Sequence, residues 1–316
     1  MADQVIPVAA TSCRADAAER ELNAKMARNQ ACVLCHTPVV DSVLGTGGYR
    51  ICLKCDLAWS LDTEPVTASG DWKERYYGRA DIVQLHERRQ SGMNAIVKRL
   101  SELHPHRGLL LDVGTGVGIF MSAAAKDDWR VEGIEPSSIA AERARKLTGA
   151  RVYNDIFENV KLSEGRYDAV CIIDTLRHVP EPRVFLSSAR RLIRPGGILL
   201  IREFYQRIWQ YYRRLWRKPE TTLRSQPRSQ EYAQCFSPKS LLYAVGAIGL
   251  DGWIEPSPIF VESECPYSMF AFSKRVAGLA SRSVYRISGH RICISPNVLA
   301  IGRAPSENTT RSVSTR

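Results

Sequence analysis

The sequence predicts a doubly wound α/β domain behind a small cysteine-bearing module. Three observations indicate this architecture: apolar runs of strand length alternate with helical patterns, a glycine cluster follows the first run, and two Cys-x-x-Cys pairs lie near the amino terminus. Strands that alternate with helices form a parallel sheet with right-handed crossovers. The 316 residues suffice for one such domain and an accessory module.

The composition is that of an ordinary globular protein, with 44% hydrophobic and 24% charged residues. No run approaches the roughly 18 apolar residues that a membrane span needs. Residues 1–30 lack the apolar core of a signal peptide, so we expect a flexible leader there. Nine cysteines in a chain without an export signal indicate a reducing compartment, and we therefore expect a cytoplasmic protein.

Two late segments carry the net charge of +11. Residues 204–231 contain seven Lys/Arg and two Glu, a net +5, and residues 266–316 contain eight Lys/Arg and one Glu, a net +7. Together these segments give +12, so the rest of the chain sums to −1. This distribution fits an anionic partner or surface near the substrate end of the chain, and a solvated basic face would give the same pattern.

The amino-terminal module spans residues 31–61 and has the ligand pattern of a zinc ribbon. Its two Cys-x-x-Cys pairs are separated by sixteen residues and consist of Cys32, Cys35, Cys52 and Cys55. The intervening stretch, with Val39-Val40 and Tyr49–Ile51 on either side of three glycines, is predicted to form a hairpin. Four thiolates complete a tetrahedral site with no open position, so we predict one structural zinc ion.

The main domain is predicted over residues 72–303, after a polar linker at 62–71. Residues 72–103 have a helical pattern. Strands are predicted at residues 109–113, 130–134, 152–153, 167–173, 198–201, 253–254 and 297–301. Helices are predicted at residues 119–126, 137–147, 182–193 and 238–248. Residues 304–316 are polar and are expected to be disordered.

A glycine-rich loop follows the first predicted strand in the stretch LLLDVGTGVGIF, residues 109–120. Glycines allow the backbone to approach a ligand closely, and the following helix presents free N–H groups. Glu135 ends the second strand, where an acid can accept hydrogen bonds from both ribose hydroxyls. The dinucleotide pattern fails because Ile119 occupies the place of its third glycine. Asp112 at the tip of the strand suits a ligand that carries an ammonium group.

In this order, the motifs resemble those of the class I S-adenosylmethionine-dependent methyltransferases, within them the group with an N-terminal zinc ribbon. The resemblance covers residues 32–303. It rests on the motifs DVGTGVG, IEPS, NDIF, CIIDTLRHVPEP, LIRPGGILLI and FSPKSLLYAVGAIGL. It implies a Rossmann-like methyltransferase sheet and S-adenosylmethionine as the cofactor.

The resemblance also implies which residues bind the cofactor. The expected set is Asp112, Gly114, Thr115, Gly116, Glu135, Asp155, Ile156 and Tyr77. The loop would hold the methionine part, Glu135 the ribose, and Asp155 with Ile156 the adenine. A turn acid is the alternative for Asp155, and simple packing is the alternative for Tyr77.

Methyl transfer depends mainly on positioning, and a general base is needed only if the nucleophile must lose a proton. Asp174 and His178 are the candidates, because they lie near the carboxyl end of the fourth strand. For His178 a structural role is the alternative. We expect a small-molecule, sugar or lipid-linked acceptor. The alternatives are a ribosomal RNA methyltransferase, with nucleic acid as the less favoured partner, and a non-catalytic zinc-ribbon binding protein.

A basic, aromatic segment at residues 204–236 follows the fifth strand. At helical spacing, residues 204–217 present an apolar-aromatic face flanked by arginines. We expect this segment to cover the acceptor site. Peripheral contact with a membrane interface and simple core packing are the alternatives.

Overall fold

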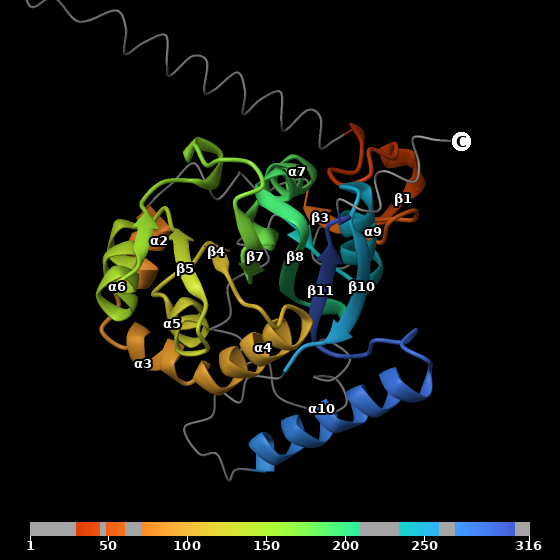
Figure 1. Cartoon of the computed structure of the whole chain (residues 1–316). Helices are drawn as coiled ribbons and strands as arrows, with labels where there is room; N and C mark the ends of the chain where they lie inside the picture. Colours follow the sequence, from red (N-terminus) through yellow and green to blue (C-terminus); the bar gives the residue numbers. More distant parts are fainter. Residues whose placement is uncertain (1–29, 45–48, 61–70, 209–233, 259–268, 307–316) are drawn as a thin grey trace, which may run out of the picture.

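The computed structural model describes residues 30–44, 49–60, 71–208, 234–258 and 269–306 (Figure 1). Nearly all of the expected leader, the expected tail beyond residue 306 and most of the basic segment at 204–236 lie outside the described residues. Ala304, the first residue of the expected disordered tail, is buried, and its N–H donates to the carbonyl of Gly197 at 2.9 Å. The folded domain therefore extends past the predicted boundary at residue 303.

A seven-stranded sheet forms the centre of the molecule, with the strand order β10-β11-β8-β7-β4-β5-β6. Five strands are parallel, and β11 is antiparallel to both of its neighbours. The bounds are β4 (Leu109–Val113), β5 (Arg130–Ile134), β6 (Arg151–Tyr153), β7 (Tyr167–Ile173), β8 (Ile193–Phe204), β10 (Asp251–Pro256) and β11 (Asn297–Arg303). Every strand predicted for the main domain is present.

The fifth strand is longer than predicted. β8 begins at Ile193, although Pro195-Gly196-Gly197 is a usual strand break and predicts a start at Ile198. The pairing with β7 shifts there: Tyr167 is opposite Ile193, and Ala169 is opposite Ile198. A bulge accommodates the extra residues without ending the strand.

Helices cover both faces of the sheet (Figure 1). On one face, α4 (Gln90–Leu103) and α5 (Ile119–Lys126) share a core with alternate residues of β4 and β7. On the other face lie α7 (Pro182–Leu192) and α9 (Pro238–Ala247). α6 (Ser138–Thr148) packs beside α5. The predicted serine caps are confirmed, since Ser137 accepts from the N–H of Ala140 and Ser237 forms a capping box with Ser240.

The helical region at residues 72–103 is three helices, where the sequence suggested one continuous pattern. These are α2 (Asp71–Tyr77), α3 (Ile82–Glu87) and α4. The chain turns after Tyr77, where Arg79 binds Asp81 through two hydrogen bonds of 2.9 and 2.7 Å. A further helix, α10 (Met269–Ile287), was not predicted. Among the described residues, none of the helices combines the length and the apolar character needed to cross a membrane.

The amino-terminal module is a small antiparallel sheet with the order β1-β2-β3-β9. Its strands are β1 (Ser42–Leu44), β2 (Tyr49–Cys52), β3 (Ala58–Ser60) and β9 (Gln234–Cys235). The predicted hairpin forms, but Val39-Val40 is not its first strand. These residues belong to the 3-10 turn η1 (Val39–Asp41), which is closed by hydrogen bonds from the N–H and the hydroxyl of Ser42 to the carbonyl of Val39.

The module and the main domain share one hydrophobic core. Trp59 of β3 pairs with Gln234 of β9, and the Gln234 side-chain amide donates to the carbonyls of Val179 and Pro180 at 2.8 and 3.0 Å. Residues of the module pack in the same apolar cluster as the sheet face covered by α7 and α9. The predicted boundary near residue 61 therefore separates two sheets but not two independent cores.

Candidate metal and cofactor sites

Two turns of equal geometry present the four cysteines. In the first, Cys32 donates its N–H to Thr37 and accepts from the N–H of His36, at 2.8 and 2.9 Å. In the second, Cys52 does the same with Leu57 and Asp56, at 2.9 Å for both bonds. His36 and Asp56 each have a positive φ, of 56° and 64°. This repeat is the pair of knuckles that the cysteine spacing predicts.

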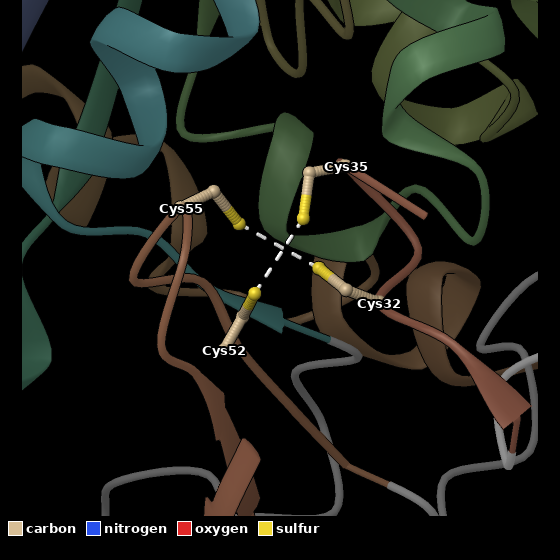
Figure 2. Close-up of side chains that lie close together, drawn as sticks. All are labelled: Cys32, Cys35, Cys52 and Cys55. Atoms are coloured by element: carbon tan, nitrogen blue, oxygen red, sulfur yellow. Dashed lines mark hydrogen bonds between the residues drawn. The ribbon is translucent and has the colours of Figure 1, made fainter. Parts of the chain in front are cut away.

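The four thiol sulfur atoms point toward a common centre (Figure 2). All lie within 4.8 Å of one another, with Sγ distances of 3.6 Å between Cys32 and Cys55 and 3.5 Å between Cys35 and Cys52. Zinc–sulfur bonds of about 2.3 Å in a tetrahedron place the sulfurs about 3.8 Å apart. The thiol of Cys55 lowers the pKa of Cys32 to about 5 by hydrogen bonding. The spacing, the burial and the thiol chemistry of the four cysteines all fit a zinc ion. The neighbouring His36 is exposed and does not belong to this group.

The glycine loop between β4 and α5 follows a path that side chains would block. Gly114, Gly116 and Gly118 have φ values of 79°, 54° and 86°. A Cβ at Gly114 would lie 2.3 Å from the hydroxyl of Thr175. The N–H groups of Gly114 and Thr115 bind the carbonyl of Ile134 at 2.8 and 3.1 Å, which fixes the loop at the end of β5.

Two carboxylates lie at this loop, Asp112 at the end of β4 and Glu135 just after β5. Both are buried. Glu135 accepts from the N–H groups of Gly116 and Ser137 at 2.8 and 2.9 Å, and a carboxylate retains the capacity to accept further bonds. The Oδ1 atom of Asp112 has no hydrogen-bond partner among the described residues. Burial raises the pKa of Asp112 to about 7, the charge of Glu135 adds to this, and the Thr115 side chain opposes it.

Tyr77 lies against the glycine loop, because a Cβ at Gly116 would be 3.0 Å from its hydroxyl oxygen. Burial raises the pKa of Tyr77 well above its usual value, and the charge of Glu135 adds to this. α2 is fixed over α6 by two contacts: Glu74 accepts from the N–H of Ser138, and Arg143 donates to the carbonyl of Tyr77. The structure thus brings the predicted tyrosine to the predicted loop.

Asp155 and Ile156 lie beyond the carboxyl end of β6, at the start of the turn η3 (Phe157–Asn159). The Oδ1 atom of Asp155 accepts from the N–H of Ile156 at 2.7 Å and from the Asn159 amide at 2.9 Å. Asp155 thus supports its own turn, the alternative role named above, and its carboxylate retains the capacity to accept a further bond. The exposed side chain of Ile156 has room to pack against a ligand.

Asp174 follows β7 with a φ of 56° and forms ion pairs with Arg202 and, at 2.5 Å, with Arg177. Burial alone would raise the pKa of Asp174, but the charges of Arg202 and Arg177 hold it below its usual value. His178 ends the short turn η4 (Leu176–His178) and is half-buried. Both predicted residues lie at the carboxyl end of the sheet, but Asp174 is committed to two guanidinium groups.

Sequence reasoning missed the network around this aspartate. Arg202 donates to the side chains of Asn297 and Ser257 at 2.6 and 3.3 Å, while Glu203 forms an ion pair with Arg177 at 3.0 Å. Arg202 and Glu203 are both buried. A signal was available, since these two charges interrupt the apolar strand ILLIREF. Buried charges of this kind occur where they are paired.

The fold and the glycine loop define a class of protein. Its sheet is parallel except for one antiparallel strand. A glycine loop follows the first strand of the βα units, and an acidic residue follows the second strand. This is the arrangement of the class I methyltransferases. Residues 85–253, more than half of the chain, match a family model described as a methyltransferase domain. The chain therefore belongs to this methyltransferase family.

Curated relatives are more distant. The chain is 28% identical over 163 residues to a ubiquinone biosynthesis O-methyltransferase of Vibrio parahaemolyticus, covering 49% of this chain and 68% of the relative. It is 33% identical over 103 residues to the 2-methyl-6-phytyl-1,4-hydroquinone methyltransferase of Synechocystis, covering 31% and 32%. The chain covers only 58% of the length of several further ubiquinone biosynthesis O-methyltransferases.

Solved structures share the fold at low identity. A complex of the Haloferax volcanii Trm112 methyltransferase activator with a methyltransferase matches with a TM-score of 0.51 and 17% identity, covering 75% of this chain and 96% of the other. The plantazolicin methyltransferase BpumL, in complex with S-adenosylhomocysteine, matches with a TM-score of 0.50 and 13% identity, covering 73% and 93%.

Proposed function

We propose that this protein transfers a methyl group from S-adenosylmethionine to a hydroxyl group on a small aromatic acceptor. The observation that carries the cofactor assignment is the buried, unsatisfied Oδ1 atom of Asp112 at the glycine loop, next to Glu135. A buried polar atom without a partner is costly unless a ligand completes it. The ammonium group of the methionine part is the donor that Asp112 lacks.

The remaining cofactor contacts follow from the placement of the predicted residues. The loop from Gly114 to Gly116 would receive the methionine part, Glu135 the ribose hydroxyls, and Asp155 with Ile156 the adenine. Tyr77 would close over the bound cofactor from α2. When bound, S-adenosylmethionine supplies an activated methyl group on a sulfonium, so the protein has mainly to position the acceptor.

Cofactor affinity should depend on pH through Asp112. In the free protein its pKa is about 7, whereas an ammonium ligand favours the ionised carboxylate and lowers that pKa. Binding therefore releases a proton below pH 7. Calorimetry should show affinity for S-adenosylmethionine falling roughly tenfold or more from pH 7.5 to pH 5.5. Asp112→Asn should bind more weakly with a flatter profile, and a variant with the wild-type profile would contradict the assignment.

The acceptor class rests on the relatives. The curated relatives reported above are named as an O-methyltransferase of ubiquinone biosynthesis and as a methyltransferase of a phytyl hydroquinone, which is a hydroxylated aromatic compound with a lipid tail. These names favour a small-molecule or lipid-linked acceptor over a sugar, and they give no support to the RNA alternative. The non-catalytic alternative is disfavoured by the intact glycine loop and Glu135.

The acceptor would approach at the carboxyl ends of β7 and β8, beside Asp174 and His178. Because Asp174 is paired with Arg177 and Arg202, we assign it a positioning role. His178 is the better candidate to take the proton of an acceptor hydroxyl, since a general base contributes about 10²–10⁴-fold to such a step.

A transfer assay with labelled S-adenosylmethionine tests this proposal. Dihydroxybenzene and hydroquinone acceptors with and without a prenyl tail should be methylated, and RNA should not. His178→Ala should lower kcat roughly a hundredfold or more at unchanged affinity for S-adenosylhomocysteine. His106→Ala, in the loop after α4, is the matched control. Full activity of His178→Ala would remove the base assignment, and methylation of RNA alone would overturn the acceptor class.

We also propose that the zinc ion is structural, because protein ligands fill all four positions. The basic segment at 204–236 keeps its proposed role over the acceptor site, although residues 209–233 lie outside the described part. Support comes from Gln234 near its carboxyl end, which donates to the carbonyls of Val179 and Pro180 directly after His178. Both ends of the segment also contact the cysteine module. Arg207 pairs with Asp56 at 2.5 Å, and β9 pairs with β3.

A further inference from the structure

Helix α10 is an insertion between the last two strands, β10 and β11. Figure 1 shows it outside the central sheet, near the lower end of β10. Its 19 residues make it about 28 Å long. Apolar side chains that gather on the exposed side of such a helix mark an interaction surface.

One side of α10 is anchored to the domain. Ser281 is fully buried, and the hydroxyl of Tyr285 donates to the carbonyl of Ile254 in β10. The Tyr285 ring also stacks on His290, with the ring centroids 4.8 Å apart. These contacts fix the rotation of the helix about its own axis and so determine which residues face outward.

The opposite side carries exposed aliphatic residues. Val276, Leu279 and Ile287 are 47%, 65% and 87% exposed. At 100° per residue these three lie within about 80° of one another, on the side away from Ser281. Ile292, in the loop after the helix, adds a fourth exposed side chain at 53%. Four of the ten exposed large apolar side chains in the described residues thus lie in this short stretch.

Cations border this apolar stripe. Arg282 and Arg286 are exposed and lie beside it on the helix, and Arg291 is exposed in the loop that follows. The sequence from residue 269 to residue 296 contains five Lys/Arg and no Asp or Glu. The outer side of α10 therefore combines aliphatic groups with an unopposed positive charge.

We propose that α10 is a docking helix for the surface of an anionic lipid bilayer. A basic helix with a separate apolar stripe lies in the bilayer interface, where the stripe enters the acyl boundary and the cations meet anionic headgroups. Charge complementarity selects the anionic surface. The branched aliphatic side chains favour lipid over nucleic acid, whose phosphates and bases are bound by cationic, polar and aromatic groups.

The insertion is attached next to the proposed acceptor site. Its flanks meet where the N–H of Ser257 donates to the carbonyl of Asn297 at 2.9 Å, and the side chains of both residues bind Arg202. Arg202 in turn pairs with Asp174. A bilayer bound by α10 would thus lie near the carboxyl end of the sheet, where a lipid-linked acceptor would enter. The docking proposal itself rests on the helix and not on the identity of the acceptor.

Vesicle flotation with the full chain tests the proposal. Vesicles of phosphatidylcholine with about 30% phosphatidylglycerol should bind the protein roughly tenfold more than pure phosphatidylcholine, and high salt should release it. Leu279→Ser with Ile287→Ser, and separately Arg282→Gln with Arg286→Gln, should each reduce binding roughly tenfold. The matched control is Val184→Ser with Leu242→Ser, two exposed apolar residues on α7 and α9, which should bind as the wild type does.

Melting temperature and affinity for S-adenosylhomocysteine should be unchanged in all of these variants, which separates lost docking from lost folding. Wild-type binding by both α10 variants would overturn the proposal. The proposal would also be overturned if the double variant Trp209→Ala with Arg213→Ala were the only variant to lose vesicle binding, because the contact would then belong to residues 204–217. Retention on RNA with no binding to either vesicle would also overturn it.

Discussion

Cys52→Ser is expected to release the bound metal and to lower the melting temperature of the whole chain by about 10 °C or more. The physical reason is that the four cysteines are buried in the same hydrophobic cluster as the sheet face under α7 and α9. A structural zinc site contributes folding free energy directly. A loss of several kcal/mol corresponds to this shift, at about 2–4 °C per kcal/mol for a domain of this size.

Metal analysis and calorimetry check this expectation. Protein purified without added zinc should contain about one equivalent of zinc per chain, and Cys52→Ser should contain far less. Cys293→Ser is the matched control, because Cys293 is a half-buried thiol that does not belong to the group of four cysteines. This variant should retain the metal. A wild-type protein that is metal-free and still melts at the same temperature after chelation would refute a structural zinc site.

Glu135→Ala should weaken binding of S-adenosylmethionine by about 1–3 kcal/mol, roughly 5- to 150-fold in Kd. Two losses combine in this variant. The ribose hydroxyls lose their proposed acceptor, and the buried N–H groups of Gly116 and Ser137 lose the carboxylate that now accepts from them at 2.8 and 2.9 Å. Glu135→Gln keeps one acceptor oxygen and should fall between the wild type and Glu135→Ala.

Calorimetric titration with S-adenosylhomocysteine gives the comparison without turnover. Glu142→Ala is the control, because Glu142 lies exposed on α6. Among the described residues its ion-pair partner is Lys146, at 2.6 Å. Its affinity should match the wild type. A change of less than about threefold for Glu135→Ala would show that Glu135 supports the loop without binding the cofactor.

The local signals were strong wherever one segment of sequence decides its own structure. The strand patterns in the sequence predicted every strand of the main sheet, and serine caps located the starts of α6 and α9. The spacing of the cysteines predicted both knuckles. The glycine cluster predicted the loop at which the structure brings Asp112, Glu135 and Tyr77 together. In each case the information lies within a few residues of the feature.

Errors arose where distant segments compete for the same residues. Pro195-Gly196-Gly197 is a usual stop signal, but pairing with β7 carries β8 through it as a bulge. Val39-Val40 has strand propensity, yet the tight turn closed by Ser42 holds these residues in η1. The sequence makes Asp174 a candidate base at a strand end and shows no partner for it. Only the fold reveals that Arg177 and Arg202 neutralise it.

The sequence by itself determined the class of fold, the four-cysteine cluster and the glycine loop, because short-range spacing and backbone geometry specify them. Only the tertiary structure decided three further features: that β9 joins the zinc module to the main domain, that a buried ion network supports the acceptor end, and that α10 turns its aliphatic and cationic side outward. These depend on contacts between residues far apart in the chain. Such long-range contacts leave no periodic pattern of residues in the sequence from which they could be predicted.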